Sequence, residues 1–424
     1  MNNFVKNNEP LLAALGLYIL AFILQLPSFI KSGFIRIIGK DFLTCALLLA
    51  LFIIFVWRIF NSASGVYLTT ASTVLLLANW SQPMLYYSCA LNDDVPYIAS
   101  KVKIFTIIVI AVTVAIWFSM GFIEKFWEHQ WIMSALGIII SLGICAVVFL
   151  FSDSESNTST VFNIQPALIM LFIILYCFSV FLQKHLLFGF RIAHLFCFWA
   201  MIAILIYRHE MGIPLIAYGS CIIMYLLFYP LPKIGELLIL IAVPIIGAIM
   251  LVIQSPALLN DTIGKITQRF GENEHAFKAV LKLKNAGLFG STDYIYLPEA
   301  SSDFALNTNI STFGYIWFIV FVVLLFLGCR KKGHELSSPS GYYLSKNLQS
   351  LSFVTFCVII VYNIGVNMAS VAIMGVQSLF CGISYSIAVL SGAILGSITY
   401  DQKSIEKAAD TIVRFCTEND NRAY

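Results

Sequence analysis

Long runs of apolar residues recur along almost the whole chain, with short polar stretches between them. Most runs hold about 18 to 22 residues, which is long enough for a helix to cross a hydrocarbon core of about 30 Å. In lipid the backbone has to satisfy its own hydrogen bonds, so the runs are predicted to be helices and not strands. About twelve spans are expected, at roughly 11–30, 42–60, 66–88, 103–121, 131–151, 164–183, 191–207, 212–230, 236–255, 313–329, 347–368 and 376–399.

Charges in the short loops predict the orientation of the spans, because cytoplasmic loops carry an excess of Lys and Arg. The loops expected on that side hold Arg58, Lys125, Lys184 with Arg191, Lys233, and Arg330 to Lys332 with Lys346. An even number of spans then places both termini in the cytoplasm and the long segment before residue 313 outside. The loop with Lys31, Arg36 and Lys40 conflicts with this orientation.

The amino-acid composition distinguishes between a soluble protein and a membrane protein. The 424 residues are 60% hydrophobic and 11% charged, with a mean hydropathy of +0.89, whereas a soluble globular chain carries about 25% charged residues. A formal net charge of +3 gives no reason to expect a nucleic-acid partner. The ten cysteines show no CxxC or metal-ligand spacing and are expected to be packing residues. The predicted class is an all-α polytopic membrane protein.

The longest polar segment lies between the ninth and tenth predicted spans. A connection of about 60 residues is far longer than usual. Within it Glu274, Lys278 and Lys282 recur at four-residue spacing, with apolar residues between them. This predicts an amphipathic helix over 274–284 that lies on the membrane surface. Its lysines, together with Arg269, could bind an anionic head group such as a pyrophosphate; a merely solvated helix face is the alternative.

Two carboxylates, Glu299 and Asp303, follow this helix where the chain is expected to return to the membrane. An ionisable group at such a depth is costly unless it has a partner or a task. A low dielectric there would raise the pKa of the carboxyl group, which suits a general base. Capping of the helix that follows is the alternative role for Asp303.

The stretch 287–317 resembles the signature of the SEDS family (shape, elongation, division and sporulation; the RodA, FtsW and SpoVE proteins). The family carries a Gly-Leu-Phe-Gly turn, a YLPEAHTDF element and a following Gly. The corresponding stretches here are GLFG at 287–290, YLPEA at 296–300, SDF at 302–304, and Gly314.

Further stretches resemble other motifs of the family in the same order. They are PMLYYS at 83–88, FNIQP at 162–166, HEMG at 209–212, NIG at 363–365 and the closing segment from Gly375 to Gly396. The resemblance covers roughly residues 66–400 and implies a ten-span core with an outer loop at about 256–312. Two extra spans at 1–65 precede this core, and a cytoplasmic tail at 401–424 follows it.

SEDS proteins are peptidoglycan glycosyltransferases. They join lipid-linked disaccharide-peptide units, release undecaprenyl pyrophosphate and work beside a class B penicillin-binding transpeptidase. The resemblance implies the same activity here, in a bacterial cytoplasmic membrane, with lipid II and the growing lipid-linked glycan as ligands. The family's catalytic Asp corresponds to Asp303, which would take a proton from the acceptor hydroxyl.

The resemblance and the loop chemistry together predict a set of substrate-binding residues. They are Glu299, Pro298, Ser302, Arg269, Lys278, Lys282, Gln165 and Glu210. Basic members of the set would stabilise the departing pyrophosphate. No metal site and no cofactor are expected in the chain, although a divalent cation could arrive with the substrate pyrophosphate.

Several polar residues of the family pattern are missing. The Glu and Lys that follow Gln-Pro in the family are Leu168 and Leu171 here, and the acidic pair after the TDF element is Ser311–Thr312. Two other readings therefore stay open. One is a non-catalytic scaffold or lipid-substrate transporter that organises a class B penicillin-binding protein. The other is a polymerase or ligase of a different undecaprenyl-linked glycan.

Overall fold

The computed structural model describes residues 2–89, 91–125, 130–151, 165–183, 186–208, 210, 212–227, 234–254, 274–291, 303–336, 344–368 and 376–401. Within these ranges every regular element is a helix. The all-α class predicted from the apolar runs is confirmed.

The helices coincide with the predicted spans. They are α1 (Asn2–Lys31), α2 (Ile35–Phe60), α3 (Ala63–Ala78), α4 (Ser81–Ser88), α5 (Val95–Lys125), α6 (Gln130–Phe151), α7 (Pro166–Phe181), α8 (Phe188–Tyr207), α9 (Gly212–Leu227), α10 (Ile234–Gln254), α12 (Glu274–Lys284), α13 (Ala305–Phe313), α14 (Tyr315–Leu336), α15 (Leu344–Asn367) and α16 (Tyr385–Thr399). A short 3-10 turn, Asn92–Asp94, precedes α5. The predicted spans fall on these helices with two exceptions. The span 66–88 is divided between α3 and α4, and of the span 376–399 only the part from residue 385 onward is helical, as α16, whereas 376–384 contains no regular element.

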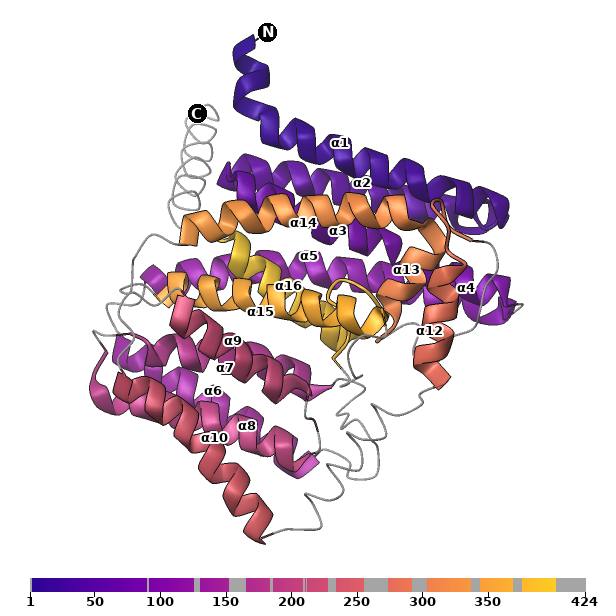
Figure 1. The fold of residues 1–424 in the computed structure, drawn as a ribbon. Helices are drawn as coiled ribbons and strands as arrows, with labels where there is room; N and C mark the ends of the chain where they lie inside the picture. The colour runs from indigo at the N-terminus through magenta and orange to yellow at the C-terminus, as the bar shows by residue number, and fades with distance from the viewer. Residues whose placement is uncertain are drawn as a thin grey trace, which may run out of the picture.

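The long helices lie side by side across the molecule (Figure 1). At one edge α1 and α2 pack on α3, and α14 packs on α3 and α1. The middle of the bundle holds α5, α16 and α15, followed by α7 and α9 and then α8 and α6, while α10 lies at the far edge. The short helices α4, α12 and α13 gather at one end of this arrangement.

Polar and apolar side chains are distributed as in a membrane protein. Leu47, Phe118 and Val361 are 67%, 71% and 70% exposed, whereas Thr69 and Gln82 are completely buried. Six helices among the described residues are long and apolar enough to cross a membrane, and four shorter ones are also apolar. Apolar groups on the outside and polar groups inside are stable only where the surroundings are lipid. The chain is a multi-pass membrane protein.

Glycines allow the closest helix contact in the centre of the bundle. A Cβ atom on Gly392 would lie 2.7 Å from the Val109 carbonyl oxygen, and one on Gly396 would lie 2.8 Å from that of Thr113. The hydroxyl of Thr113 in turn donates to the Gly392 carbonyl at 3.2 Å. Small residues four apart bring the backbones of α5 and α16 together, as is common between membrane helices.

The break between α3 and α4 is a difference from the predicted single span. It occurs at Asn79, whose side-chain amide donates to the Gly382 carbonyl and accepts from the Gly382 amide at 2.8 Å. A buried asparagine that replaces two backbone partners can hold an interrupted helix in the membrane. The break turns α4 toward α13, with consequences for the candidate site.

Candidate functional site

The candidate site lies at the end of the bundle where α4, α12, α13 and the last turn of α15 meet (Figure 1). Asp303 is buried there, with 9% of its surface exposed. It directly precedes Phe304, the N-cap residue of α13. A carboxylate next to the amino end of a helix is favoured by the positive end of the helix dipole.

Helix α13 is short, polar and completely buried. All nine of its residues are buried, among them Asn307, Thr308, Asn309, Ser311 and Thr312. A nine-residue helix is about 14 Å long, so it cannot cross the bilayer. Its polar groups must find partners within the protein.

Amide side chains attach α13 to α15. Asn367 accepts from the Asn307 backbone N–H at 2.6 Å and donates to the Asp303 carbonyl oxygen at 3.1 Å. One turn earlier, Asn363 accepts a hydrogen bond from the Ser378 hydroxyl at 3.0 Å. Asn367 therefore fixes the backbone on both sides of the first turn of α13, including that of Asp303.

The opposite side of α13 is attached to α4 and to the segment before α16. The Ser81 hydroxyl donates to the side-chain oxygen of Asn309 at 2.6 Å, and the Asn309 side-chain nitrogen lies 3.4 Å from the Cys381 sulfur. Cys381 directly precedes Gly382, the residue that Asn79 binds. The break after α3 thus places Ser81 against the site helix.

Lys282 on α12 points toward α13. Its ammonium group is almost completely buried and donates to the Thr308 hydroxyl at 3.2 Å. Burial lowers the pKa of Lys282 to about 8, because removal from water disfavours the charged form. Near neutral pH this lysine is still mostly protonated.

Helix α12 has the predicted bounds, but two of its three lysines, Lys278 and Lys282, face different surroundings. Lys282 is buried, whereas Lys278 is half-buried at the surface. The neighbouring Phe277 is 70% exposed. The helix therefore presents an apolar side chain outward and directs one cation into the protein, an arrangement that the spacing of the lysines alone did not predict.

The glycines of the GLFG stretch place this turn against the start of α14. Gly290 has φ +88°, and a Cβ atom on it would lie 2.0 Å from the Thr312 carbonyl oxygen. Gly314 has φ +89°, and its Cβ atom would lie 2.3 Å from the Leu288 carbonyl oxygen. The amides of Tyr315 and Ile316 then bind the carbonyls of Gly287 and Leu288 at 3.2 Å. Only glycine fits at both contacts.

Two more predicted residues lie at the same end of the bundle. Gln165 occupies the N-cap position of α7, and its backbone N–H donates to the Ser386 hydroxyl on the first turn of α16 at 2.7 Å. Glu210 lies in the turn between α8 and α9, where its amide binds the Leu205 carbonyl at 2.9 Å. Both are half-buried.

The other predicted site residues, Glu299, Pro298, Ser302 and Arg269, lie outside the described residues, as does the tail beyond Asp401. In the part of the chain that is described, no three His, Cys, Asp or Glu side chains gather as a metal ion would require. The asparagines 307, 309 and 367 were not predicted as site residues. Amides at positions 363 and 367, one turn apart in the mostly apolar second half of a predicted span, were the signal that could have found Asn367.

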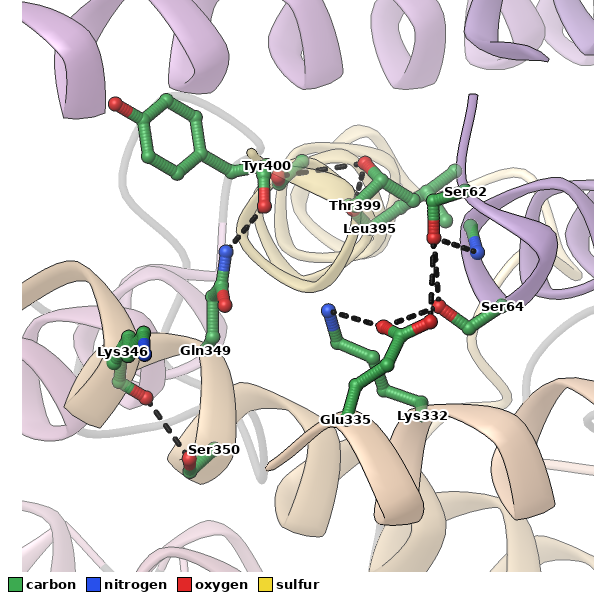
Figure 2. Close-up of polar contacts among 12 residues, drawn as sticks. Ser62, Ser64, Lys332, Glu335, Lys346, Gln349, Ser350, Leu395, Thr399 and Tyr400 are labelled. Atoms are coloured by element: carbon green, nitrogen blue, oxygen red, sulfur yellow. Dashed lines mark hydrogen bonds and ion pairs between the residues drawn. The ribbon is translucent and has the colours of Figure 1, made fainter. Parts of the chain in front are cut away.

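A second polar cluster lies at the other end of α14 (Figure 2). The Glu335 carboxylate accepts from the Ser64 hydroxyl at 2.6 Å and from the Ser62 hydroxyl at 3.4 Å, and it lies 3.5 Å from the Lys332 ammonium. These groups satisfy one another and connect the start of α3 to the end of α14. The cluster is an internal tie between helices.

The similarity of this chain to known proteins is a similarity of fold. No protein-family model matches the chain, and no curated protein matches its sequence. A solved chain from a peptidoglycan synthase complex, whose structure describes the coordination of polymerization and crosslinking, is similar with a TM-score of 0.54 at 13% sequence identity. The match covers 77% of this chain and 96% of the other. This chain has a SEDS-type fold. At such low identity the similarity establishes the SEDS-type fold alone, and the chemistry has to be argued from the site.

Proposed function

We propose that this protein is a peptidoglycan glycosyltransferase that polymerises lipid II and releases undecaprenyl pyrophosphate. Asp303 acts as the general base that accepts the proton of the acceptor sugar hydroxyl as it attacks the anomeric carbon of the donor. The product is a longer lipid-linked glycan, made at the outer surface of a bacterial cytoplasmic membrane.

One observation carries the proposal: in a SEDS-type fold, the only acidic residue of the SDF element is buried at the start of a polar helix inside the bundle. Such a helix requires partners on every side, and Asn367, Ser81 and Lys282 supply them. A network of this kind holds a carboxylate and its surroundings in one geometry, as a reaction between two bound sugars requires.

Lys282 is assigned to the leaving group, whereas Asp303 is assigned to the acceptor hydroxyl. The buried ammonium of Lys282 is the described cation attached to α13, and its charge counts for more there than it would in water. We assign it to stabilising negative charge on the departing pyrophosphate. Lys278 and Arg269 would attract the anionic head group earlier, and Glu299, Pro298, Ser302, Gln165 and Glu210 complete the proposed set of substrate-binding residues.

The proposed partners follow from the same activity. They are the membrane, lipid II and a class B penicillin-binding protein that crosslinks the new glycan, and both termini of the chain lie in the cytoplasm. A divalent cation bound to the substrate pyrophosphate would share the task of Lys282.

The test is glycan synthesis from lipid II by the purified protein, with chains resolved on a gel. Replacing a general base typically lowers the rate by about 10²- to 10⁴-fold, so Asp303→Asn and Asp303→Ala should abolish visible polymer. Asp41→Asn is the matched control, because Asp41 pairs with Lys103 at 3.0 Å on the outside of the bundle and is about half exposed. Polymer at the wild-type rate from folded Asp303→Asn would refute the catalytic assignment.

A second function is supported by one specific observation. Leu168 and Leu171 stand where the family has a Glu and a Lys, and both are completely buried in α7. A SEDS-type fold without that pair could instead act as a scaffold or lipid-substrate transporter that organises a class B penicillin-binding protein. In that case wild-type protein makes no polymer but forms a stable complex with the transpeptidase. Transfer of a different undecaprenyl-linked glycan, with none from lipid II, would identify the third alternative.

A further inference from the structure

We infer that the N-terminal helix α1 positions the site helix α13, and that Ser28 is the positioning residue. The motif pattern places α1 and α2 outside the ten-span core. In the structure, however, the carboxyl half of α1 contacts α13 directly. The catalytic part of this inference rests on the proposed function, whereas its structural part does not.

The direct link is a buried hydrogen bond between residues far apart in the chain. The Ser28 hydroxyl donates to the Thr312 carbonyl oxygen at 2.7 Å, across a separation of 284 residues. Both residues are buried, with 5% and 2% of their surfaces exposed. A carbonyl in this position has no water to bind if the donor is lost.

The carbonyls at the end of α13 show why this donor matters. The last carbonyls of a helix have no partner within the helix. Here Ile310 is bound by the Gly314 amide at 2.8 Å and Ser311 by the Ser291 amide at 2.9 Å. The next carbonyl, that of Thr312, is bound by Ser28. A side chain from outside the predicted core therefore completes the C-terminal cap of the site helix.

Aromatic rings extend the contact on both sides of this bond. Phe29 packs against Phe313 with ring centroids 5.5 Å apart, and both rings are buried. At the turn into α2, Phe34 packs against Tyr87 of α4 at 5.9 Å. The N-terminal pair of helices, α1 and α2 with the turn between them, thus contacts both α13 and α4. On the other side of α13, Ser81 of α4 donates a hydrogen bond to Asn309. These contacts restrict how α13 can shift along its axis.

Because α13 is only nine residues long, a shift at its carboxyl end moves its amino end as well. Asp303 stands one residue before the N-cap and shares a backbone anchor, Asn367, with Asn307. Small misplacements of a catalytic group can lower a rate by about 100-fold. Ser28 would therefore influence catalysis without touching the substrate.

The experiment compares three variants of the full-length protein in lipid nanodiscs: Ser28→Ala, Ser28→Thr and Tyr18→Phe. Tyr18→Phe is the matched control, because its hydroxyl also makes a buried bond, to the Ala46 carbonyl at 2.9 Å, but within the N-terminal pair. The measurements are amide hydrogen exchange over 305–313 and the kcat and KM of glycan synthesis.

Ser28→Ala should accelerate exchange in α13 by about fivefold or more and lower kcat by about tenfold with little change in KM. Ser28→Thr should restore both values, and Tyr18→Phe should leave both unchanged. Unchanged exchange in Ser28→Ala, or an equal effect of Tyr18→Phe, would overturn the inference.

Should Ser28→Ala not fold, Phe29→Leu takes its place with the same criteria. If the wild-type protein makes no glycan, the proposed function fails and the exchange measurement still decides the structural part.

Discussion

At the residue scale, the buried ammonium of Lys282 has opposite effects on stability and on the proposed activity. Burial holds its pKa at about 8, below the ordinary lysine value of 10.5. Between these two pH values the unfolded chain binds more protons than the folded chain, so stability rises with pH across this window. Below pH 8 the folded state carries the full cost of burying the charge.

Lys282→Met should therefore stabilise the protein at pH 7, by about 1–3 kcal/mol, because it removes a buried charge and keeps the volume. The gain should shrink as the pH approaches 10. Glycan synthesis should fall in the same variant, because the cation proposed to face the pyrophosphate is lost. Thermal unfolding at two pH values and the gel assay check both expectations. Lys278→Met is the control, since Lys278 is only half-buried; equal stabilisation by both variants would contradict the argument.

The contact between Gly290 and Gly314 is another residue-scale feature. A Cβ atom on Gly314 would lie 2.4 Å from the Gly290 backbone nitrogen, and one on Gly290 would lie 2.0 Å from the Thr312 carbonyl oxygen; both residues have positive φ. The GLFG motif was recognisable as a turn, but its partner surface at the α13–α14 junction was not. Glycines in a sequence indicate that another backbone comes close, but they do not identify the element to which that backbone belongs.

At the scale of elements, α14 joins the two ends of the molecule. Its first residue follows the site helix by one glycine, and its last turn carries the cluster of Lys332, Glu335, Ser62 and Ser64 (Figure 2). Gly328 of α14 also lies close to α3, where a Cβ atom would be 2.8 Å from Leu68. Helices α3 and α14 therefore pack closely at Gly328 and are joined by the polar cluster at the end of α14.

Glu335→Ala should destabilise the protein by about 2–4 kcal/mol, because it leaves the buried Lys332 ammonium and the Ser64 hydroxyl without this partner. The double variant Glu335→Ala/Lys332→Met should recover much of the loss, since no buried charge then remains. Unfolding in detergent measures both changes. A loss below about 0.5 kcal/mol would show that the cluster behaves as an exposed ion pair. Activity per folded molecule should stay unchanged, because the site is at the other end of α14.

At the scale of the whole molecule, the predicted membrane orientation places the two ends of the helix bundle on opposite sides of the membrane. The basic loop after α14 is expected in the cytoplasm, and α12 is expected outside. Truncated fusions test this: alkaline phosphatase fused after Lys284 should be active, and green fluorescent protein fused after Leu336 or after Tyr424 should be fluorescent. The reversed pattern would refute the orientation and would put Asp303 on the side where no glycan is assembled. It would also explain the basic loop with Lys31, which conflicts with the present assignment.

Local sequence was sufficient for most of the helices and for the position of one carboxylate, Asp303, just before a short helix. The transfer free energy of an apolar run depends mainly on its own residues, so most of the predicted spans fall on helices. The amphipathic spacing located α12 at its observed bounds. Asp303 was singled out as a carboxylate among apolar spans, and it is buried at the start of α13. These features need no knowledge of what lies next to them.

Only the tertiary structure decided which surfaces meet. It turned Lys282 inward, divided one predicted span at Asn79, joined Asn307 to Asn367 and set Ser28 under the last turn of α13. Each of these depends on a partner remote in the chain, 284 residues away in the case of Ser28. A polar group in lipid is stable only against such a partner. The sequence therefore indicates that a polar residue within a span must be bound, while the identity of its partner follows from the packing of the helices.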